Sequence, residues 1–141
     1  MKISEIMRAP AKTISPEAGL DRALVMMRQQ RIRHLPVVEN GQLVGLITDR
    51  DLRLSMVESE GPEKHPPGMY LPALTKVRTV MIQDVLVTYP EDPVPEKAQL
   101  MAEKKIGCLP VLEPGSRKVI GIVTETDLLK FLARLLKEKA Y

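Results

Sequence analysis

The sequence predicts an α/β (α+β) fold built from two copies of one β-α-β-β-α unit. The phrase Gly-Leu-Ile-Thr-Asp-Arg-Asp-Leu at residues 45–52 returns as Gly-Ile-Val-Thr-Glu-Thr-Asp-Leu at residues 121–128. Around this phrase, residues 3–38 align without gaps on residues 77–112. A single unit of about 50 residues is too small to bury both faces of its sheet. We therefore expect the two copies to be related by a pseudo-twofold axis and to pack through their sheets as one module.

The first copy opens with a short helical turn at residues 3–7 and a brief extended piece at residues 12–14. Ser15-Pro16-Glu17 then predicts the start of a helix, because Ser is a common N-cap and Pro is favoured at the first helical position. The next residues carry the apolar spacing of an amphipathic helix, at Leu20, Ala23, Leu24 and Met27.

A hairpin and a second helix complete the unit. Two apolar runs, residues 35–38 and 43–47, flank Asn40-Gly41, which is the strongest short-range signal for a β-hairpin. The second run is apolar throughout, as expected of a strand that is covered on both faces. Thr48 follows it directly and is predicted to open the second helix.

The second copy repeats this order, with Tyr89 in the place of Ser15 and therefore a weaker predicted cap. We expect repeat 1 at residues 1–58, a Pro-rich linker at residues 59–76, and repeat 2 at residues 77–141. The last repeat ends in an amphipathic helix whose wide apolar face predicts packing on the other half or on a partner chain, and favours a homodimer; this face comprises Leu128, Phe131, Leu132, Leu135 and Leu136.

Composition argues against several classes of protein. The chain of 141 residues is 44% hydrophobic, 3% aromatic and carries a net charge of +3. Its Lys and Arg are interleaved with Asp and Glu, so no basic stripe indicates nucleic-acid binding. Cys108 is the only cysteine, which excludes an internal disulfide and fits a reducing, cytoplasmic location. No apolar run approaches the length of a membrane span.

Catalysis and metal binding are also disfavoured. His34 and His65 lie far apart and have no companion ligands at metal-site spacing. Cys108 has no His placed beside it, so a packing role is favoured over a nucleophilic one. The acidic pairs Asp49/Asp51 and Glu91/Asp92 do not converge on one reacting atom. We expect no enzyme, no catalytic residue, no metal and no required cofactor.

The repeated Thr-x-x-Asp has two interpretations. It resembles a capping box, in which the Thr hydroxyl and the acid satisfy backbone N–H groups of the helix start. It also lies at the carboxyl end of a buried strand, where α/β proteins bind ligands. There the helix N-terminus favours a phosphate, and a carboxylate in the first turn can accept both hydroxyls of a ribose.

The combination of Ile-x-x-Leu-Pro-Val, an Asn-Gly hairpin and Gly-h-h-Thr-x-x-Asp, where h is an aliphatic residue, resembles a pair of cystathionine-β-synthase (CBS) domains, the Bateman module. The likeness covers residues 3 to about 132. It implies a regulatory module that binds AMP, ADP, ATP or S-adenosylmethionine between its halves, dimerises and acts on a partner protein. The phrases IRHLPVVENGQLVGLITDRDLR, KIGCLPV and GIVTETDLL further resemble the acetoin-utilisation group. Members of that group often carry a C-terminal ACT-type domain, which we do not expect here.

The resemblance assigns roles residue by residue. Asp51 and Asp127 would hold ribose hydroxyls, and Thr48 and Thr124 would meet phosphate. The adenine slot would be lined by Ile32 and Ile106. Basic side chains distinguish the first copy: Arg33, His34 and Arg50 stand where the second copy has Gly107, Cys108 and Thr126. We therefore expect unequal sites, with the first copy supplying most of the phosphate-binding charge.

Two alternatives remain open. In one, the threonines only cap helices and the protein is a ligand-free scaffold for dimerisation. In the other, the spread basic residues bind nucleic acid.

Overall fold

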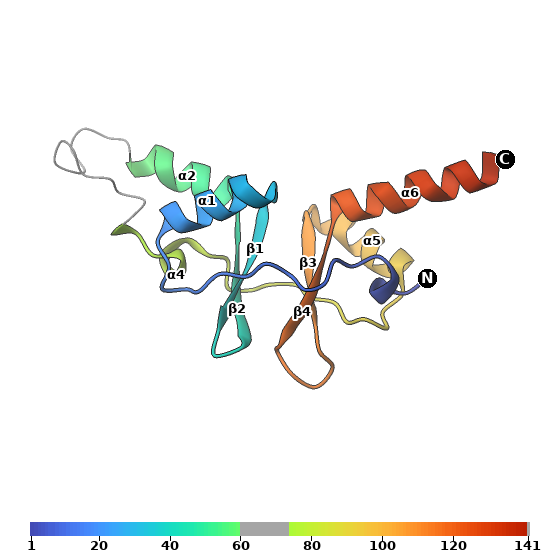
Figure 1. Cartoon of the computed structure of the whole chain (residues 1–141), viewed down its shortest axis with the longest axis horizontal. Coiled ribbons are helices and arrows are strands. Elements are labelled where there is room, and N and C mark those ends of the chain that lie inside the picture. The colour runs from blue at the N-terminus through green and yellow to red at the C-terminus, as the bar shows by residue number, and fades with distance from the viewer. Residues whose placement is uncertain (60–73, 141) are drawn as a thin grey trace. The chain divides into compact units, whose positions relative to one another are not determined.

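The computed structural model describes residues 1–59 and 74–140 (Figure 1). The predicted linker at residues 59–76 lies largely outside this part of the chain, and His65 lies wholly outside it. The described helices and strands, in chain order, are η1 (Ile3–Glu5), α1 (Leu20–Gln30), β1 (His34–Glu39), β2 (Gln42–Thr48), α2 (Asp49–Ser59), α4 (Val77–Val80), α5 (Val94–Lys104), β3 (Cys108–Leu112), β4 (Val119–Thr124) and α6 (Glu125–Ala140).

The chain forms two compact units that cut across the sequence repeats. One unit comprises Lys12–Val85, and the other joins Met1–Ala11 to Leu86–Tyr141. The opening segment of each repeat therefore packs in the unit that holds the rest of the other repeat. A hydrophobic pattern indicates that such a segment is buried, but not which copy buries it.

The Lys12–Val85 unit contains the antiparallel hairpin of β1 and β2, from which the chain passes directly into α2 (Figure 1). Asn40 and Gly41 both have positive φ, 53° and 77°, as a type I′ turn requires, so the predicted hairpin is confirmed. The expected extended piece at residues 12–14 contributes one parallel bridge, from Ile14 to Val37. A core of buried apolar side chains links these parts, and its fully buried members include Leu35, Val37, Ile47, Leu52 and Val77.

The predicted helix start at Ser15-Pro16-Glu17 is wrong. The helix begins at Leu20, with Gly19 as its N-cap. Ser15 instead closes a tight turn, because its hydroxyl oxygen accepts the Glu17 N–H at 3.1 Å and its carbonyl accepts the Ala18 N–H at 3.2 Å. This is the local side chain to backbone bonding that competes with helix formation at Ser. In the second repeat the same place holds a turn closed by Asp92, which accepts the Thr88 hydroxyl and the Tyr89 N–H.

The other unit contains the antiparallel hairpin of β3 and β4, with a parallel bridge from Thr88 to Val111. Its core holds a residue from the start of the chain: Ile3 is fully buried with Val94, Val111 and Val123. The Ile3 N–H donates to the Asp92 carbonyl at 2.9 Å. The N-terminal segment is thus an integral part of the unit that contains the second repeat's strands.

Glycines at one strand position allow these opening segments to approach. A Cβ added at Gly45 in β2 would lie 2.5 Å from Met81 Sδ and 2.9 Å from the Ile82 carbonyl oxygen. At the sister position, Gly121 in β4, a Cβ would lie 2.8 Å from the Arg8 carbonyl oxygen. Both distances are too short for ordinary contact, so the motif's glycine is required by packing.

The apolar face of α6 is only partly used within its unit. Leu128 and Phe131 pack against the buried cluster around Ile3. Leu129, Leu132 and Leu136 are 64%, 48% and 58% exposed. Among the described helices, none is both long and apolar enough to cross a membrane.

Candidate functional site

The first candidate corner lies where β2 ends and α2 begins. Thr48 is the last residue of β2, and its backbone N–H and hydroxyl both donate to Asp51 Oδ2, at 3.1 and 2.7 Å. The Asp51 N–H donates back to Thr48 Oγ1 at 3.2 Å. The pair is therefore a complete capping box, and its negative charge lies at the positive end of the helix.

Three further predicted residues of the first repeat lie next to this corner. His34 pairs with Thr48 across the hairpin, and the Arg33 carbonyl accepts the Asp49 N–H at 2.9 Å. Ile32 precedes them, half-buried, just after the end of α1. The side chains of Arg33 and of the sixth predicted residue, Arg50 in the first turn of α2, are exposed. The fold thus brings the predicted set of the first repeat to one place in the unit.

The second candidate corner has the same construction. The Thr124 N–H and hydroxyl donate to Asp127 Oδ2 at 2.8 and 3.0 Å, and the Asp127 N–H donates to Thr124 Oγ1 at 3.4 Å. The Gly107 carbonyl accepts the Glu125 N–H at 3.0 Å, which repeats the Arg33 contact of the first corner. Ile106 is half-buried at the place that corresponds to Ile32.

One cation of the second corner was missed by sequence reasoning. Arg8, in the N-terminal segment, places Nε 3.3 Å from Asp127 Oδ1 and Nη2 3.5 Å from Thr124 Oγ1. No motif includes Arg8, and its counterpart in the other repeat is Ile82. Comparing the two copies outside the motif is the only sequence signal that could have found it.

Cys108 does not offer a reactive group. Its side chain is buried, at 3% exposure, and burial raises the pKa of the thiol to about 12. The thiolate, which is the nucleophilic form, is therefore scarce at neutral pH. This agrees with the packing role favoured by the sequence. Among residues 1–59 and 74–140, no group of three His, Cys, Asp or Glu side chains is placed to hold a metal ion.

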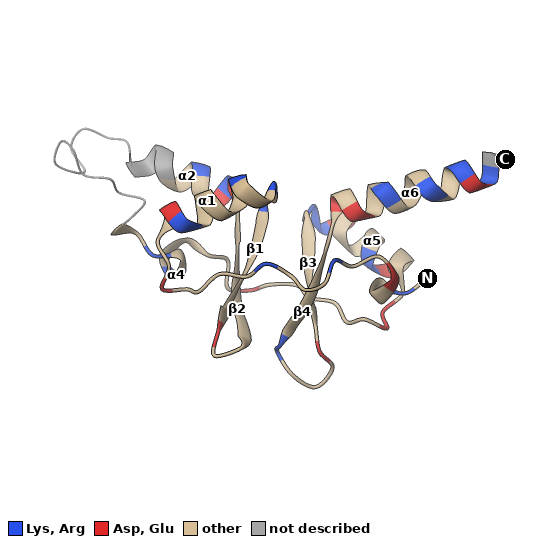
Figure 2. Cartoon of the chain, in the orientation of Figure 1, with Lys and Arg blue, Asp and Glu red and all other residues tan. Residues whose placement is uncertain are grey.

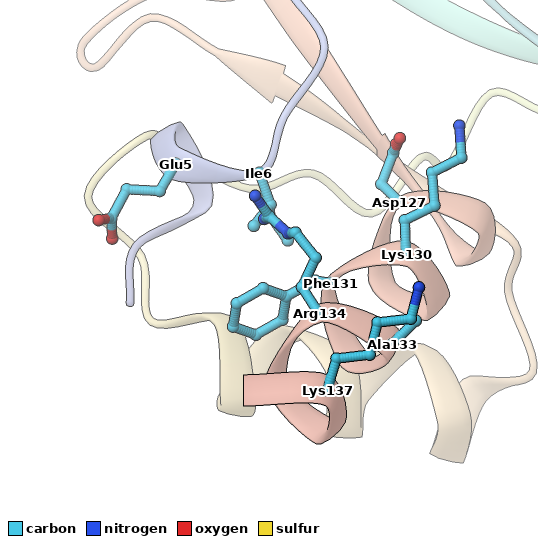
Figure 3. A pocket seen from close by; sticks show the side chains of 8 residues that line it. All are labelled: Glu5, Ile6, Asp127, Lys130, Phe131, Ala133, Arg134 and Lys137. Atoms are coloured by element: carbon cyan, nitrogen blue, oxygen red, sulfur yellow. The ribbon is translucent and has the colours of Figure 1, made fainter. Parts of the chain in front are cut away.

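A pocket of about 490 Å³ lies beside α6, within the unit that contains the second corner (Figure 3). Asp127 is the only predicted site residue that lines it, and Figure 3 shows Arg134 reaching from α6 toward Ile6. The guanidinium of Arg134 also lies 5.8 Å from the centre of the Phe131 ring. The remaining lining residues are Glu5, Lys130, Ala133 and Lys137.

The protein is a tandem-repeat module. Each of its two units has a Thr–Asp capping pair where a strand passes into a helix. The model of the CBS domain family matches residues 3–58 and 77–134. The chain therefore belongs to the CBS domain family, and it has the CBS pair fold predicted from its sequence. CBS domain pairs are regulatory modules rather than catalytic ones.

Similar proteins support this assignment. A CBS domain-containing protein of Dictyostelium discoideum is 38% identical over 136 residues, which cover 96% of this chain and 93% of the relative. The chain spans only 24% of the homoserine O-acetyltransferase of Methanococcoides burtonii, at 29% identity over 92% of its own length.

Solved structures have the same fold. A Vibrio cholerae protein assigned to acetoin utilization superposes with a TM-score of 0.82 at 29% identity, covering 99% of this chain and 96% of that one. The CBS domain pair of MJ0100, in complex with 5′-methylthioadenosine and S-adenosylmethionine, has a TM-score of 0.81 at 24% identity, with 94% and 96% coverage. CBSX2 in complex with AMP has a TM-score of 0.74 at 23% identity, with 95% and 97% coverage.

Proposed function

We propose that this chain is a ligand-sensing module that binds an adenosine-containing compound at its Thr–Asp corners and passes its state to a partner protein. The observation that carries the proposal is the first corner. There Asp51 commits Oδ2 to the helix cap, while two exposed arginines, Arg33 and Arg50, flank the same strand end. The fold shared with the MJ0100 and CBSX2 complexes supports an adenosine ligand, such as AMP, ADP, ATP or S-adenosylmethionine.

Each part of such a ligand has a chemical match at this corner. Ribose hydroxyls are donors, and an ionised carboxylate such as Asp51 only accepts. A phosphate is attracted by the N-terminal N–H groups of α2, by the Thr48 hydroxyl and by a guanidinium. The half-buried Ile32 offers an apolar surface to adenine. In the second repeat, Thr124, Asp127 and Ile106 are the corresponding candidates.

Regulation would follow from differential affinity. A ligand that binds one arrangement of the module more tightly than another shifts the population toward it, typically by about 1–3 kcal/mol of coupling. The partner would respond to that shift. In this role the adenosine compound is a regulatory ligand and not a cofactor.

Thermal unfolding tests the proposal. AMP, ATP or S-adenosylmethionine at 100-fold above its dissociation constant should add about 2.7 kcal/mol of stability and raise the Tm by several degrees. Asp51→Asn should remove most of this rise, because the amide replaces one acceptor oxygen by an NH2 donor and removes the negative charge. Asp92→Asn is the matched control, since Asp92 also accepts a Thr hydroxyl and a backbone N–H but belongs to a turn elsewhere.

The control distinguishes a loss of ligand binding from a loss of stability caused by removing a local carboxylate contact. Asp92→Asn should lower the Tm of the free protein and leave the ligand-induced rise intact. If none of the three compounds shifts the Tm of the unmodified chain, the proposal fails and the scaffold interpretation stands in its place. That interpretation is favoured by the two complete capping boxes, which satisfy Thr48 and Thr124 without any ligand.

Nucleic-acid binding receives less support. In α6, acidic residues lie before and among the Lys and Arg residues, and α1, α2 and α5 also carry both charges (Figure 2). A protein that neutralises several phosphates needs a concentrated basic surface and loses affinity steeply as salt rises. Such salt-dependent retention on nucleic acid would favour this alternative.

We also propose that the module is a homodimer that uses α6. Leu129, Leu132 and Leu136 are spaced for one side of a helix and are each about half or more exposed. A matching stripe on a second copy would bury them in a twofold interface. Light scattering should therefore give a mass near twice the 15.8 kDa of one chain. Leu132→Glu should reduce that mass to one chain, and a monomeric unmodified protein would contradict the proposal.

A further inference from the structure

Arg8 and Ile82 occupy sister positions in the two units. The backbone of each residue pairs with one residue in the second strand of its unit's hairpin. The Arg8 N–H and carbonyl pair with Ile122 in β4 at 2.9 Å each, and those of Ile82 pair with Leu46 in β2 at 2.8 and 2.9 Å. The backbones therefore match, and the side chain is the difference between the two corners at this position.

At the second corner, Arg8 forms an ion pair with the carboxylate of Asp127. Asp127 is buried, with 8% of its side chain exposed, and Oδ2 is already used by the helix cap. The other oxygen, Oδ1, lies 3.3 Å from Arg8 Nε. A buried carboxylate needs a partner of opposite charge, and the guanidinium supplies it.

At the first corner, the corresponding side chain is apolar. Ile82 has no donor to offer Asp51, and in the described parts of the chain the side-chain bonds of Asp51 run through Oδ2. Among residues 1–59 and 74–140, no bond to Asp51 Oδ1 competes with a ligand for this oxygen. The same motif is consequently built twice, with the acceptor open in one copy and neutralised in the other.

We infer that Arg8 closes the Asp127 carboxylate to ribose, so that the corner of the first repeat alone takes a nucleoside. The inference rests on the proposed function and specifies which of its two corners is the nucleoside site. A ribose at the second corner would have to displace Arg8 from a buried carboxylate. Because a buried carboxylate that loses its cationic partner is strongly destabilised, we expect this to weaken binding at least about tenfold.

Calorimetric titration with adenosine tests the inference. Adenosine carries the ribose but no phosphate, which Arg8 would otherwise attract. The unmodified chain should bind one equivalent, and Asp51→Asn should bind none. Arg8→Ile, which installs the sister residue, should bind two equivalents. Ile82→Arg, the reverse exchange, should weaken binding at the first corner at least about tenfold. Arg8→Lys, which keeps a cation there, should still bind one equivalent.

The outcomes separate this inference from the proposed function. If the unmodified chain binds no adenosine, the nucleoside site at Asp51 is wrong, yet a gained equivalent in Arg8→Ile would still support the role of Arg8. An Arg8→Ile chain that binds no more than the unmodified one overturns the inference. So does an Ile82→Arg chain that binds with unchanged affinity, and this second exchange decides the matter should Arg8→Ile fail to fold.

Discussion

Ile3→Ala is expected to destabilise the unit that contains the second repeat's strands, by about 2–5 kcal/mol in the free energy of unfolding. Ile3 is fully buried with Val94, Val111 and Val123, far from it in sequence, so truncation leaves a cavity in that core. Urea unfolding measures the loss. Hydrogen exchange should locate it, with protection falling in β3, β4 and α5 and not in α1, β1 and β2.

Val77→Ala is the matched control, because Val77 is the sister residue of Ile3 and is fully buried in the other unit. Its smaller side chain predicts a smaller loss, with protection falling in α1, β1 and β2. Should Ile3→Ala reduce protection across Lys12–Val85 instead, the assignment of the N-terminal segment to the other unit would be wrong.

Gly45→Ala is expected to cost about 1–3 kcal/mol, the range for overpacking a filled core. The new Cβ would lie 2.5 Å from Met81 Sδ and 2.9 Å from the Ile82 carbonyl oxygen. Met81 is flexible and can turn aside, but the Ile82 carbonyl accepts the Leu46 N–H at 2.9 Å and cannot move without breaking that bond. Chemical denaturation measures the effect.

The exposed neighbour Gln42 provides the comparison. Gln42→Ala, in the same strand, should change the free energy of unfolding by no more than about 0.5 kcal/mol. Gly121→Ala should repeat the Gly45→Ala loss, because its Cβ would lie 2.8 Å from the Arg8 carbonyl oxygen. If Gly45→Ala proved as mild as Gln42→Ala, the close approach of the opening segments would be disproved.

Much of the architecture could be predicted from local patterns. The internal repeat predicted two copies of one unit, and Asn40-Gly41 predicted the hairpin. The Thr48-x-x-Asp51 spacing predicted the helix cap. These features depend on residues a few positions apart, whose bonding is decided by backbone geometry alone. Sequence reasoning is strongest for such contacts.

The failures have physical causes of other kinds. Ser15 can cap a helix or close a turn with equal chemistry, and the turn prevails here. Each opening segment packs in the unit that holds the rest of the other repeat. The sequence does not predict this, because apolar residues such as Ile3 and Val77 suit either core. Arg8 reaches Asp127 only through this packing, so a motif-centred comparison of the corners could not place a cation there.

The claim that Asp51 binds the ribose is tested most directly by comparing the affinities of two ligands for two proteins. Adenosine and 2′,3′-dideoxyadenosine differ only in the ribose hydroxyls, and the proteins differ only at Asp51→Asn. If this carboxylate holds the sugar, the unmodified chain should prefer adenosine at least about tenfold, and the variant should bind both equally weakly. The same preference in both proteins would show that the sugar is held elsewhere.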